Sequence, residues 1–231
     1  MTSVAICQSS YIPWRGYFDM ISSVDEFIFL DDVQYTRRDW RNRNYIKGPD
    51  GLQRLSIPVR NKGQYSALIN QVRVVDDLWR SEHLRSLRHA YSRSPFFSVV
   101  YPFLEGLYHH SSSNYLSSIN ISLIEGILRY LGVSTGLTMS SSFSPEGVKG
   151  DRIFNLCLEV GASVYLTGPS ARDYLVEDKF NAAGIEVRYM DYSLYPEYTQ
   201  QWGAFEASVS IVDLLFNCGA DSIFQLRQNM C

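Results

Sequence analysis

The stretch that decides the fold is Cys7-Gln8-Ser9-Ser10-Tyr11-Ile12-Pro13-Trp14-Arg15-Gly16-Tyr17-Phe18-Asp19-Met20-Ile21. A β-prone run, residues 4–7, leads into it, and apolar residues recur at helical spacing over residues 17–24. A second β-prone run follows at residues 27–30. Strand, polar turn, helix and strand make a βαβ unit, whose crossover makes the two strands parallel neighbours. The stretch therefore predicts an open α/β sheet, in which ligands bind beyond the carboxyl ends of the strands.

The rest of the chain resumes this alternation after an insertion. Residues 45–59 predict a hairpin that turns at Pro49-Asp50-Gly51, and residues 68–74 are again β-prone, so we expect a small antiparallel β insertion over about residues 44–75. A helical segment over about residues 77–131 follows, with helices at 78–93, 95–109 and 114–131. Further strands are predicted at 137–139, 164–167 and 186–190, and further helices at 147–160, 171–183 and 208–217. The sequence thus predicts a single α/β domain over residues 1–231, an open, mostly parallel sheet with helices on both faces.

The composition is that of an ordinary globular protein, with 45% apolar and 19% charged residues in a chain of 231. Lys and Arg number 21 and Asp and Glu 24, so the net charge of −3 favours neither nucleic acid nor an anionic membrane. No apolar run is long enough for a transmembrane helix, and the N-terminus has no basic region followed by a long apolar one. We therefore expect a cytoplasmic protein with no membrane insertion and no nucleic-acid partner.

The cysteines and aromatic residues exclude few kinds of functional site. The four cysteines are scattered without the paired spacing of a metal site: Cys7, Cys157, Cys218 and Cys231. No spacing of His and Asp supplies a convincing ligand set, so we expect no metal and no tightly bound cofactor. Aromatic residues reach 14%, with 16 Tyr. Tyrosine-rich pockets bind sugars or nucleosides, although core packing with the hydroxyl at the surface is the commoner use of tyrosine.

The segment that follows the second predicted strand is the most informative for binding. Residues 35–44 hold four arginines, two asparagines and a tryptophan. Arginine binds carboxylates and phosphates bidentately. On an extended segment, Arg41 and Arg43 would point to one face and Asn42 and Asn44 to the other. The pattern fits a diphosphate or carboxylate ligand, and its alternatives are a solvated connector, RNA binding and the docking of an acidic carrier protein.

Three kinds of side chain are candidates for catalysis. Asp31 and Asp32 end the second predicted strand, where a carboxylate orients a substrate amine, holds a metal or merely terminates the strand. His83 is the preferred general base because an aromatic and polar groups precede it, although a helix-surface imidazole is commoner. Cys7 stands where a nucleophile would, at the carboxyl end of the first strand, although a buried strand cysteine is commoner.

Two features in the C-terminal half of the chain are weaker signals. The turn Gly168-Pro169-Ser170 joins a strand to a helix as phosphate-binding turns do, but it lacks the known phosphate-loop patterns. Asp213 and Asn217 lie four residues apart in an apolar helix. They therefore share one face and would either reach the site or tie down a loop.

Together these segments resemble the WbqC-like protein family. The resemblance rests on Gln8-x-x-Tyr11-Ile12-Pro13-Trp14-x-Gly16-Tyr17-Phe18, Asp31-Asp32-Val33-Gln34-Tyr35, Trp40-Arg41-Asn42-Arg43-Asn44, Trp79-x-x-x-His83-Leu84, Tyr91-x-x-x-Pro95-Phe96-Phe97, Thr167-Gly168-Pro169-Ser170-x-x-x-Tyr174-Leu175 and Ser210-Ile211-Val212-Asp213-Leu214-Leu215-Phe216-Asn217-x-Gly219. These blocks stand in the family's order and span nearly the whole chain. One departure is Ser9, because the family usually has Pro after the first Gln, and Ser relaxes the turn there.

The resemblance implies a role in the biosynthesis of O-antigen, a part of lipopolysaccharide, and of other bacterial surface glycans. The expected activity is an amide-forming N-acyltransferase that acts on a nucleotide-linked amino sugar. Its acyl or aminoacyl donor is expected to be a thioester of coenzyme A or of a carrier protein, bound as a cosubstrate.

Direct transfer of this kind needs a base for the amine and hydrogen-bond donors for the tetrahedral oxyanion. On this basis His83 is expected to be the base, with Asp31 or Asp32 holding the amine. Further residues are expected to bind the substrate: Gln8, Asn42 and Asn44 as donors, Arg41 and Arg43 at the diphosphate, and Tyr11, Trp14, Gln34, Gly168, Ser170, Tyr174, Asp213 and Asn217.

Two other functions stay open from the sequence. One is a non-catalytic sugar-nucleotide or carrier-protein binding module of a glycan-assembly pathway. The other is a nucleotidyl-transfer or ligase enzyme that depends on ATP and magnesium, although no phosphate-loop motif supports it. The sequence also leaves the oligomeric state open.

Overall fold

The computed structural model describes residues 2–60, 66–111 and 113–226, so Cys231 lies outside the described residues. Its centre is a five-stranded sheet in the order β5-β2-β1-β6-β7. The strands are β1 (Ser3–Cys7), β2 (Glu26–Phe29), β5 (Gly136–Met139), β6 (Val164–Thr167) and β7 (Glu186–Tyr189). All four neighbouring pairs are parallel, which confirms the predicted open α/β sheet and makes it parallel throughout.

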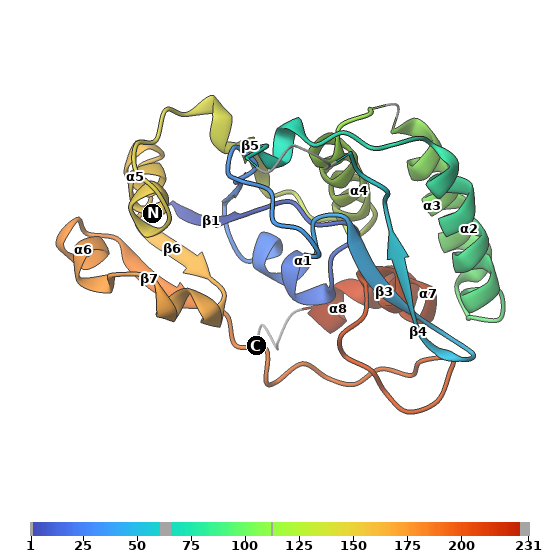
Figure 1. The fold of residues 1–231 in the computed structure, drawn as a ribbon. Helices are drawn as coiled ribbons and strands as arrows, with labels where there is room; N and C mark the ends of the chain where they lie inside the picture. The colour runs from blue at the N-terminus through green and yellow to red at the C-terminus, as the bar shows by residue number, and fades with distance from the viewer. Residues whose placement is uncertain (1, 61–65, 112, 227–231) are drawn as a thin grey trace.

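The two faces of the sheet follow the alternation of side chains along β1 and β2. Val4, Ile6 and Ile28 belong to a core cluster shared with helix α5 (Gly150–Glu159) and helix α6 (Glu177–Ala182). Ala5, Phe27 and Phe29 belong to a second and larger cluster on the opposite face. Successive residues of a strand point to opposite faces, so buried side chains at consecutive positions require cover on both sides. Helices accordingly lie on both faces of the sheet (Figure 1).

The connection from β1 to β2 contains helix α1 (Arg15–Ser22), as the opening stretch predicts. Tyr17, Phe18 and Ile21 of α1 are buried in the larger cluster. Val4 of β1 pairs with Glu26 of β2 on one side and with Tyr165 of β6 on the other, so β1 is the central strand.

The insertion contains one hairpin, formed by β3 (Arg43–Gly48) and β4 (Gly51–Ser56), which turns where it was predicted. The predicted strand at residues 68–74 is wrong, because a short 3-10 helix, η1 (Ile69–Gln71), occupies its centre. The Ile69 N–H donates to Val33 O and the Asn70 N–H to Asp31 O, both at 2.9 Å. The start of this run is therefore bonded to the segment after β2, while its end pairs antiparallel with the chain after β4 through Val59 and Val74.

Three helices follow close to their predicted positions: α2 (Leu78–Tyr91), α3 (Phe97–His110) and α4 (Leu116–Tyr130). Asp76 accepts from the backbone N–H of Leu78 at 2.9 Å and so holds the start of α2. These helices and the hairpin share the larger core cluster with α1, so the insertion and the sheet bury their apolar faces together. None of the helices in the described part of the chain is long and apolar enough to cross a membrane.

The last third of the chain is less regular than predicted. A 3-10 helix, η2 (Ser140–Ser142), follows β5, and the predicted helix at residues 171–183 is broken into η3 (Pro169–Asp173) and α6. The break lies at Leu175, which turns inward to pack against the smaller core cluster. The chain then crosses residues 190–210 without a helix or a strand before α7 (Ile211–Cys218), η4 (Gly219–Asp221) and α8 (Ser222–Leu226).

Candidate functional site

A cavity lies where the strand order reverses. In chain order, β2 and then β5 are added on one side of β1, and β6 and then β7 are added on the other side of β1. Such a reversal is the topological switch point at which open α/β sheets bind ligands, beyond the carboxyl ends of the strands. The cavity at this point has a volume of about 530 Å³, within the range of small-molecule sites.

The cavity combines aromatic rings, hydroxyl groups and one guanidinium group. Its lining residues are Ile6, Cys7, Ser10, Pro13, Trp14, Tyr17, Met20, Trp40, Arg41, Asn44, Thr167, Gly168, Pro169, Ser170, Tyr174, Tyr192 and Ser208. They come from the ends of β1 and β6, from α1 and the turn before it, from the basic segment that runs into β3, from η3 and the residue after it, and from the irregular segment after β7. Six of the residues predicted to bind substrate are among them: Trp14, Arg41, Asn44, Gly168, Ser170 and Tyr174.

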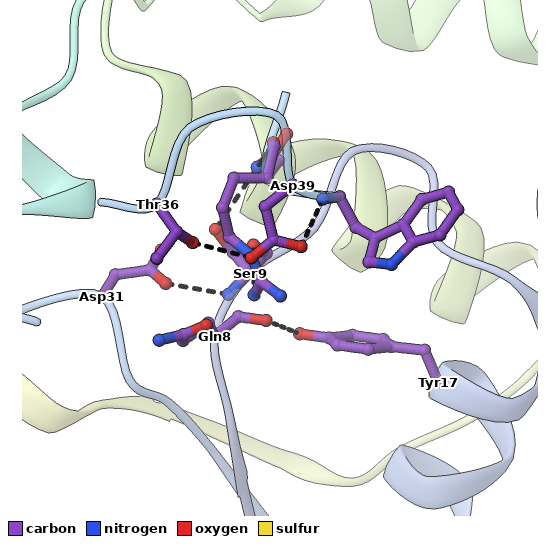
Figure 2. A network of polar contacts seen from close by, with 9 residues as sticks. Gln8, Ser9, Tyr17, Asp31, Thr36 and Asp39 are labelled. Atoms are coloured by element: carbon purple, nitrogen blue, oxygen red, sulfur yellow. Dashed lines mark hydrogen bonds and ion pairs between the residues drawn. The ribbon is translucent and has the colours of Figure 1, made fainter. Parts of the chain in front are cut away.

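A network around Ser9 shapes the turn after β1 (Figure 2). The buried carboxylate of Asp31 accepts the Ser9 N–H at 2.8 Å and a hydrogen bond from the Ser117 hydroxyl. The Tyr17 hydroxyl donates to the Gln8 carbonyl at 3.0 Å. Asp31 has no solvent-exposed surface, so its place in the described structure is that of a fixed acceptor within the wall.

Arg41 joins this network to the cavity. Its Nη1 donates to the Ser9 carbonyl at 3.2 Å, and its Nε lies 3.7 Å from a carboxylate oxygen of Asp39. Asn120 donates to the Arg41 carbonyl at 2.8 Å, which fixes the backbone at the same point. Arg41 is only 9% exposed although it lines the cavity. A guanidinium held in this way is preorganised to meet an anionic group of a ligand.

The two asparagines of the basic segment are used to hold the backbone. Asn44 donates to the carbonyls of Tyr11 and Ile12, at 3.1 and 2.8 Å, and Asn42 donates to the Ile57 carbonyl at 2.8 Å. Ile12 has φ of +35°, a conformation that β-branched residues rarely adopt. The Asn44 bonds, with a further bond from the Ser210 hydroxyl to the Ile12 carbonyl, hold this turn in place at the edge of the cavity.

Asp32 faces away from the cavity and toward α5. Its carboxylate accepts from Ser140 and forms an ion pair with Arg152, with both distances at 2.5 Å. Asp31 and Asp32 therefore point into different networks and do not form a joint carboxylate site.

His83 lies inside the protein and does not line the cavity. The Tyr11 hydroxyl and His83 Nδ1 share a hydrogen bond of 2.8 Å, the same hydroxyl contacts that of Tyr108, and the ring of Trp79 packs against the imidazole. Burial lowers the pKa of His83 to about 4, and a hydrogen bond to the backbone of Ser56 only partly opposes it. The imidazole is therefore neutral at pH 7 and links the turn after β1 to α2.

Cys7 lines the cavity, at the end of the central strand. Burial raises the pKa of its thiol, and this outweighs the opposing effects of Arg41 and of a hydrogen bond from the Gln8 backbone. The neutral thiol is thus the dominant form at pH 7, which makes it a poor nucleophile.

Asp213 and Asn217 belong to a separate polar cluster behind the cavity. Asp213 accepts from the hydroxyls of Tyr91 and Tyr198, at 2.9 and 2.8 Å, and its backbone carbonyl accepts from Asn217. Burial raises the pKa of Asp213 although these hydrogen bonds act against it. Gln200 also donates to Asp213, at 3.0 Å, so the cluster ties the irregular segment to α7. This is the loop-holding role that the sequence offered as one of two alternatives.

The other predicted binding residues surround the site without lining it. They are Gln8 and Tyr11 in the turn after β1, Gln34 after β2, and Arg43 at the start of β3. Tyr192 and Ser208, which no motif predicted, line the cavity from the two ends of the irregular segment. The ring of Tyr192 lies 4.8 Å from that of Trp14 in an edge-to-face contact. Their only signal in the sequence is the local richness in tyrosine, which names no individual residue.

The described residues contain no group of three or more His, Cys, Asp or Glu side chains that could hold a metal ion.

Comparison with known proteins gives two findings. The model of a family described as the WbqC-like protein family matches residues 8–225, a range that includes every cavity-lining residue except Ile6 and Cys7. A protein of Mycobacterium tuberculosis (strain ATCC 25618 / H37Rv), named "Uncharacterized protein Rv1507c", is 45% identical over 227 residues, which is 98% of each chain. No solved structure matches the chain.

Proposed function

Since the chain belongs to the WbqC-like protein family, we propose that it is an amide-forming N-acyltransferase of bacterial surface-glycan biosynthesis. It moves an acyl or aminoacyl group from a thioester to the amine of a nucleotide-linked amino sugar. The observation that carries this proposal is the switch-point cavity, which combines a fixed, nearly buried guanidinium with aromatic rings and hydroxyl groups.

The acceptor fits this lining through three kinds of contact. Arg41 meets the diphosphate, because a guanidinium binds phosphate oxygens in a bidentate manner. The rings of Trp14, Tyr174 and Tyr192 offer apolar faces for the sugar or the nucleobase. Hydroxyl groups that can pair with those of a sugar come from Ser10, Thr167, Ser170 and Ser208.

The proposed reaction needs little from the protein beyond positioning. The amine nitrogen attacks the thioester carbonyl, a C–N bond forms, the C–S bond breaks, and the leaving thiolate takes the proton that the nitrogen loses. Holding both reactants in one cavity replaces a bimolecular encounter, and hydroxyl donors beside the carbonyl stabilise the oxyanion. In this proposal the amine enters the reaction in its neutral form. In place of the catalytic roles predicted for them, Asp31 and His83 hold the turn after β1, and Asp32 pairs with Arg152 of α5.

A second candidate, a non-catalytic sugar-nucleotide binding module, is favoured by a different observation. The described residues that line the cavity include no His, Asp, Glu or Lys. A cavity without such a general base can bind a sugar nucleotide without catalysing any reaction, or it can catalyse acyl transfer between a thioester and an amine that are already reactive.

A mass-spectrometric endpoint assay tests the proposal. The purified protein is incubated with a panel of nucleotide-linked amino sugars and with acyl and aminoacyl thioesters of coenzyme A and of a carrier protein. A product heavier than its amino sugar by one acyl group supports the transferase. Thermal stabilisation by one sugar nucleotide, with no mass change across the panel, favours the binding module.

A further inference from the structure

The charges of the chain are distributed unevenly. Residues 37–93 hold thirteen Lys and Arg against five Asp and Glu, a net charge of +8. The remainder holds eight basic and nineteen acidic residues, a net charge of −11. The overall value of −3 therefore conceals one strongly basic segment in an otherwise acidic protein. This basic segment contains the hairpin and supplies three cavity-lining residues, Trp40, Arg41 and Asn44.

We call four arginines that lie near Trp40 in the sequence or beside Tyr45 in the hairpin the cationic rim: Arg37, Arg38, Arg43 and Arg54. Trp40 lines the cavity and is nevertheless 48% exposed, so it lies at the mouth. Its ring is 6.2 Å from that of Tyr45 on β3.

The hairpin register adds two arginines to the same face. Arg54 is the register partner of Tyr45, and directly opposed residues of two strands share a face of the sheet. Arg43 lies two residues before Tyr45 on the same strand and therefore also shares that face. Both arginines thus lie on the side of the hairpin that carries the contact to Trp40.

Within residues 35–44 four arginines stand with one carboxylate. Burial raises the pKa of Tyr35, and Arg43, Arg41 and Arg37 act against this effect. The acidic side chain among them is Asp39, which is bonded to Thr36 and to the Trp40 N–H. The buried Nε of Arg43 has no hydrogen-bond partner within the described residues. Four arginines against one aspartate give the rim a net positive charge, which is complementary to an acidic partner.

We propose that the cationic rim is the docking surface for an acidic carrier protein, which brings the acyl thioester to the cavity mouth; this inference rests on the proposed function. An exposed tryptophan among arginines has the composition of a protein-binding hot spot. A long polyanion such as RNA would extend past the rim and be repelled by the net charge of −11 on the rest of the chain. A compact acidic protein touches only the rim and avoids this repulsion. The carrier thus supplies the donor at the mouth, while the sugar nucleotide occupies the interior beside Arg41.

Charge reversal at the rim tests the proposal with two readouts. The variants are Arg38→Glu and Arg54→Glu, which change exposed residues outside the cavity lining. The matched control is Arg85→Glu, the same change at an exposed position of α2 that does not belong to the rim. The first readout is binding of fluorescently labelled holo acyl carrier protein, measured by anisotropy between 25 mM and 500 mM salt. The second is turnover with one acyl group presented either on that carrier or on pantetheine, a small donor without phosphate.

Docking at the rim predicts salt-sensitive carrier binding that weakens roughly tenfold in each rim variant and is unchanged in Arg85→Glu. Turnover from the acyl carrier falls in parallel, while turnover from acyl pantetheine stays at the wild-type rate. Carrier binding that is absent, or equal in all variants, overturns the docking inference, as does tighter binding of a single-stranded RNA of similar charge. Rim-dependent carrier binding without turnover from either donor instead refutes the transferase and leaves the docking surface standing.

Discussion

Replacing Asp31 tests whether this carboxylate builds the wall or performs chemistry. It is fully buried and accepts two hydrogen bonds, one from the Ser9 N–H at 2.8 Å and one from the Ser117 hydroxyl. Asp31→Ala leaves both donors buried without a partner, and each unpaired group costs about 1–3 kcal/mol, so we expect a loss of about 4 kcal/mol in the free energy of unfolding. Asp31→Asn keeps an acceptor for Ser9 and a donor for Ser117, so its loss is expected to be about 1–2 kcal/mol.

Urea denaturation at pH 7 measures both losses as shifts of the midpoint at constant slope. Glu125→Ala, at an exposed position of α4, is the control and stays within about 0.5 kcal/mol of wild type. An Asp31→Ala variant as stable as this control would refute the wall assignment. So would a stable Asp31→Asn variant that binds the sugar nucleotide normally and has lost all turnover, because that result makes the charge itself catalytic.

Three further predictions concern the other candidate catalytic residues. The unfolded pKa of His83 is about 6.5, and its folded pKa is about 4. The folded state keeps His83 neutral, so its contribution to the free energy of unfolding is complete above pH 6.5 and falls by roughly 3 kcal/mol as the pH drops to 4. Urea titrations at pH 7 and pH 4.5 measure this loss. A His83→Gln variant with the wild-type pH dependence would contradict it. Asp32→Asn weakens the ion pair with Arg152, so the melting temperature is expected to fall by about 3–6 °C in a calorimetric scan, and an unchanged temperature contradicts the pairing. Cys7→Ser is expected to retain turnover. Iodoacetamide is expected to label Cys7 more slowly than a free peptide thiol at pH 7, because burial raises the pKa of Cys7. Rapid labelling mapped to Cys7, or loss of turnover in the variant, would contradict a non-nucleophilic Cys7.

The parts of the fold that could be predicted are those with a local signal. The βαβ unit at the start shows period-two and helical spacing in adjacent runs, and the hairpin has a Pro-Asp-Gly turn, so both were placed correctly. The run at residues 68–74 is equally β-prone, but its first residues are bonded to residues 31–33, which no local pattern reveals. The predicted helix at residues 171–183 is broken because Leu175 packs into the core, a tertiary effect that outweighs helix propensity.

The sequence indicated the position of the cavity better than it indicated the roles of the individual residues around it. The strand ends identified the correct edge of the sheet, and Trp14, Arg41 and Gly168 do line the cavity there. Motif spacing could not show that the Asn44 amide donates a hydrogen bond to the Ile12 carbonyl, because that bond joins segments about thirty residues apart. Tyr192 was missed because it lies on a segment without periodicity, where a sequence offers no register.

The most direct test of the central claim, that ligand binds in the switch-point cavity, is to fill that cavity. Gly168 has ordinary φ, and a Cβ there would lie 3.7 Å from the Tyr192 hydroxyl and 4.0 Å from Met20 Cε, so Gly168→Leu adds a side chain without backbone strain. Its side chain then projects toward two lining residues and occupies ligand space. In Gly106→Leu, the matched control on α3, the added Cβ meets no atom within 4 Å.

Isothermal titration calorimetry with the sugar nucleotide that stabilises the wild-type protein is the deciding measurement. If ligand binds in the cavity, Gly168→Leu keeps its melting temperature and binds at least about tenfold more weakly, a loss of about 1.4 kcal/mol, whereas Gly106→Leu binds as the wild type does. Wild-type affinity in a well-folded Gly168→Leu variant would place the ligand elsewhere and contradict the account.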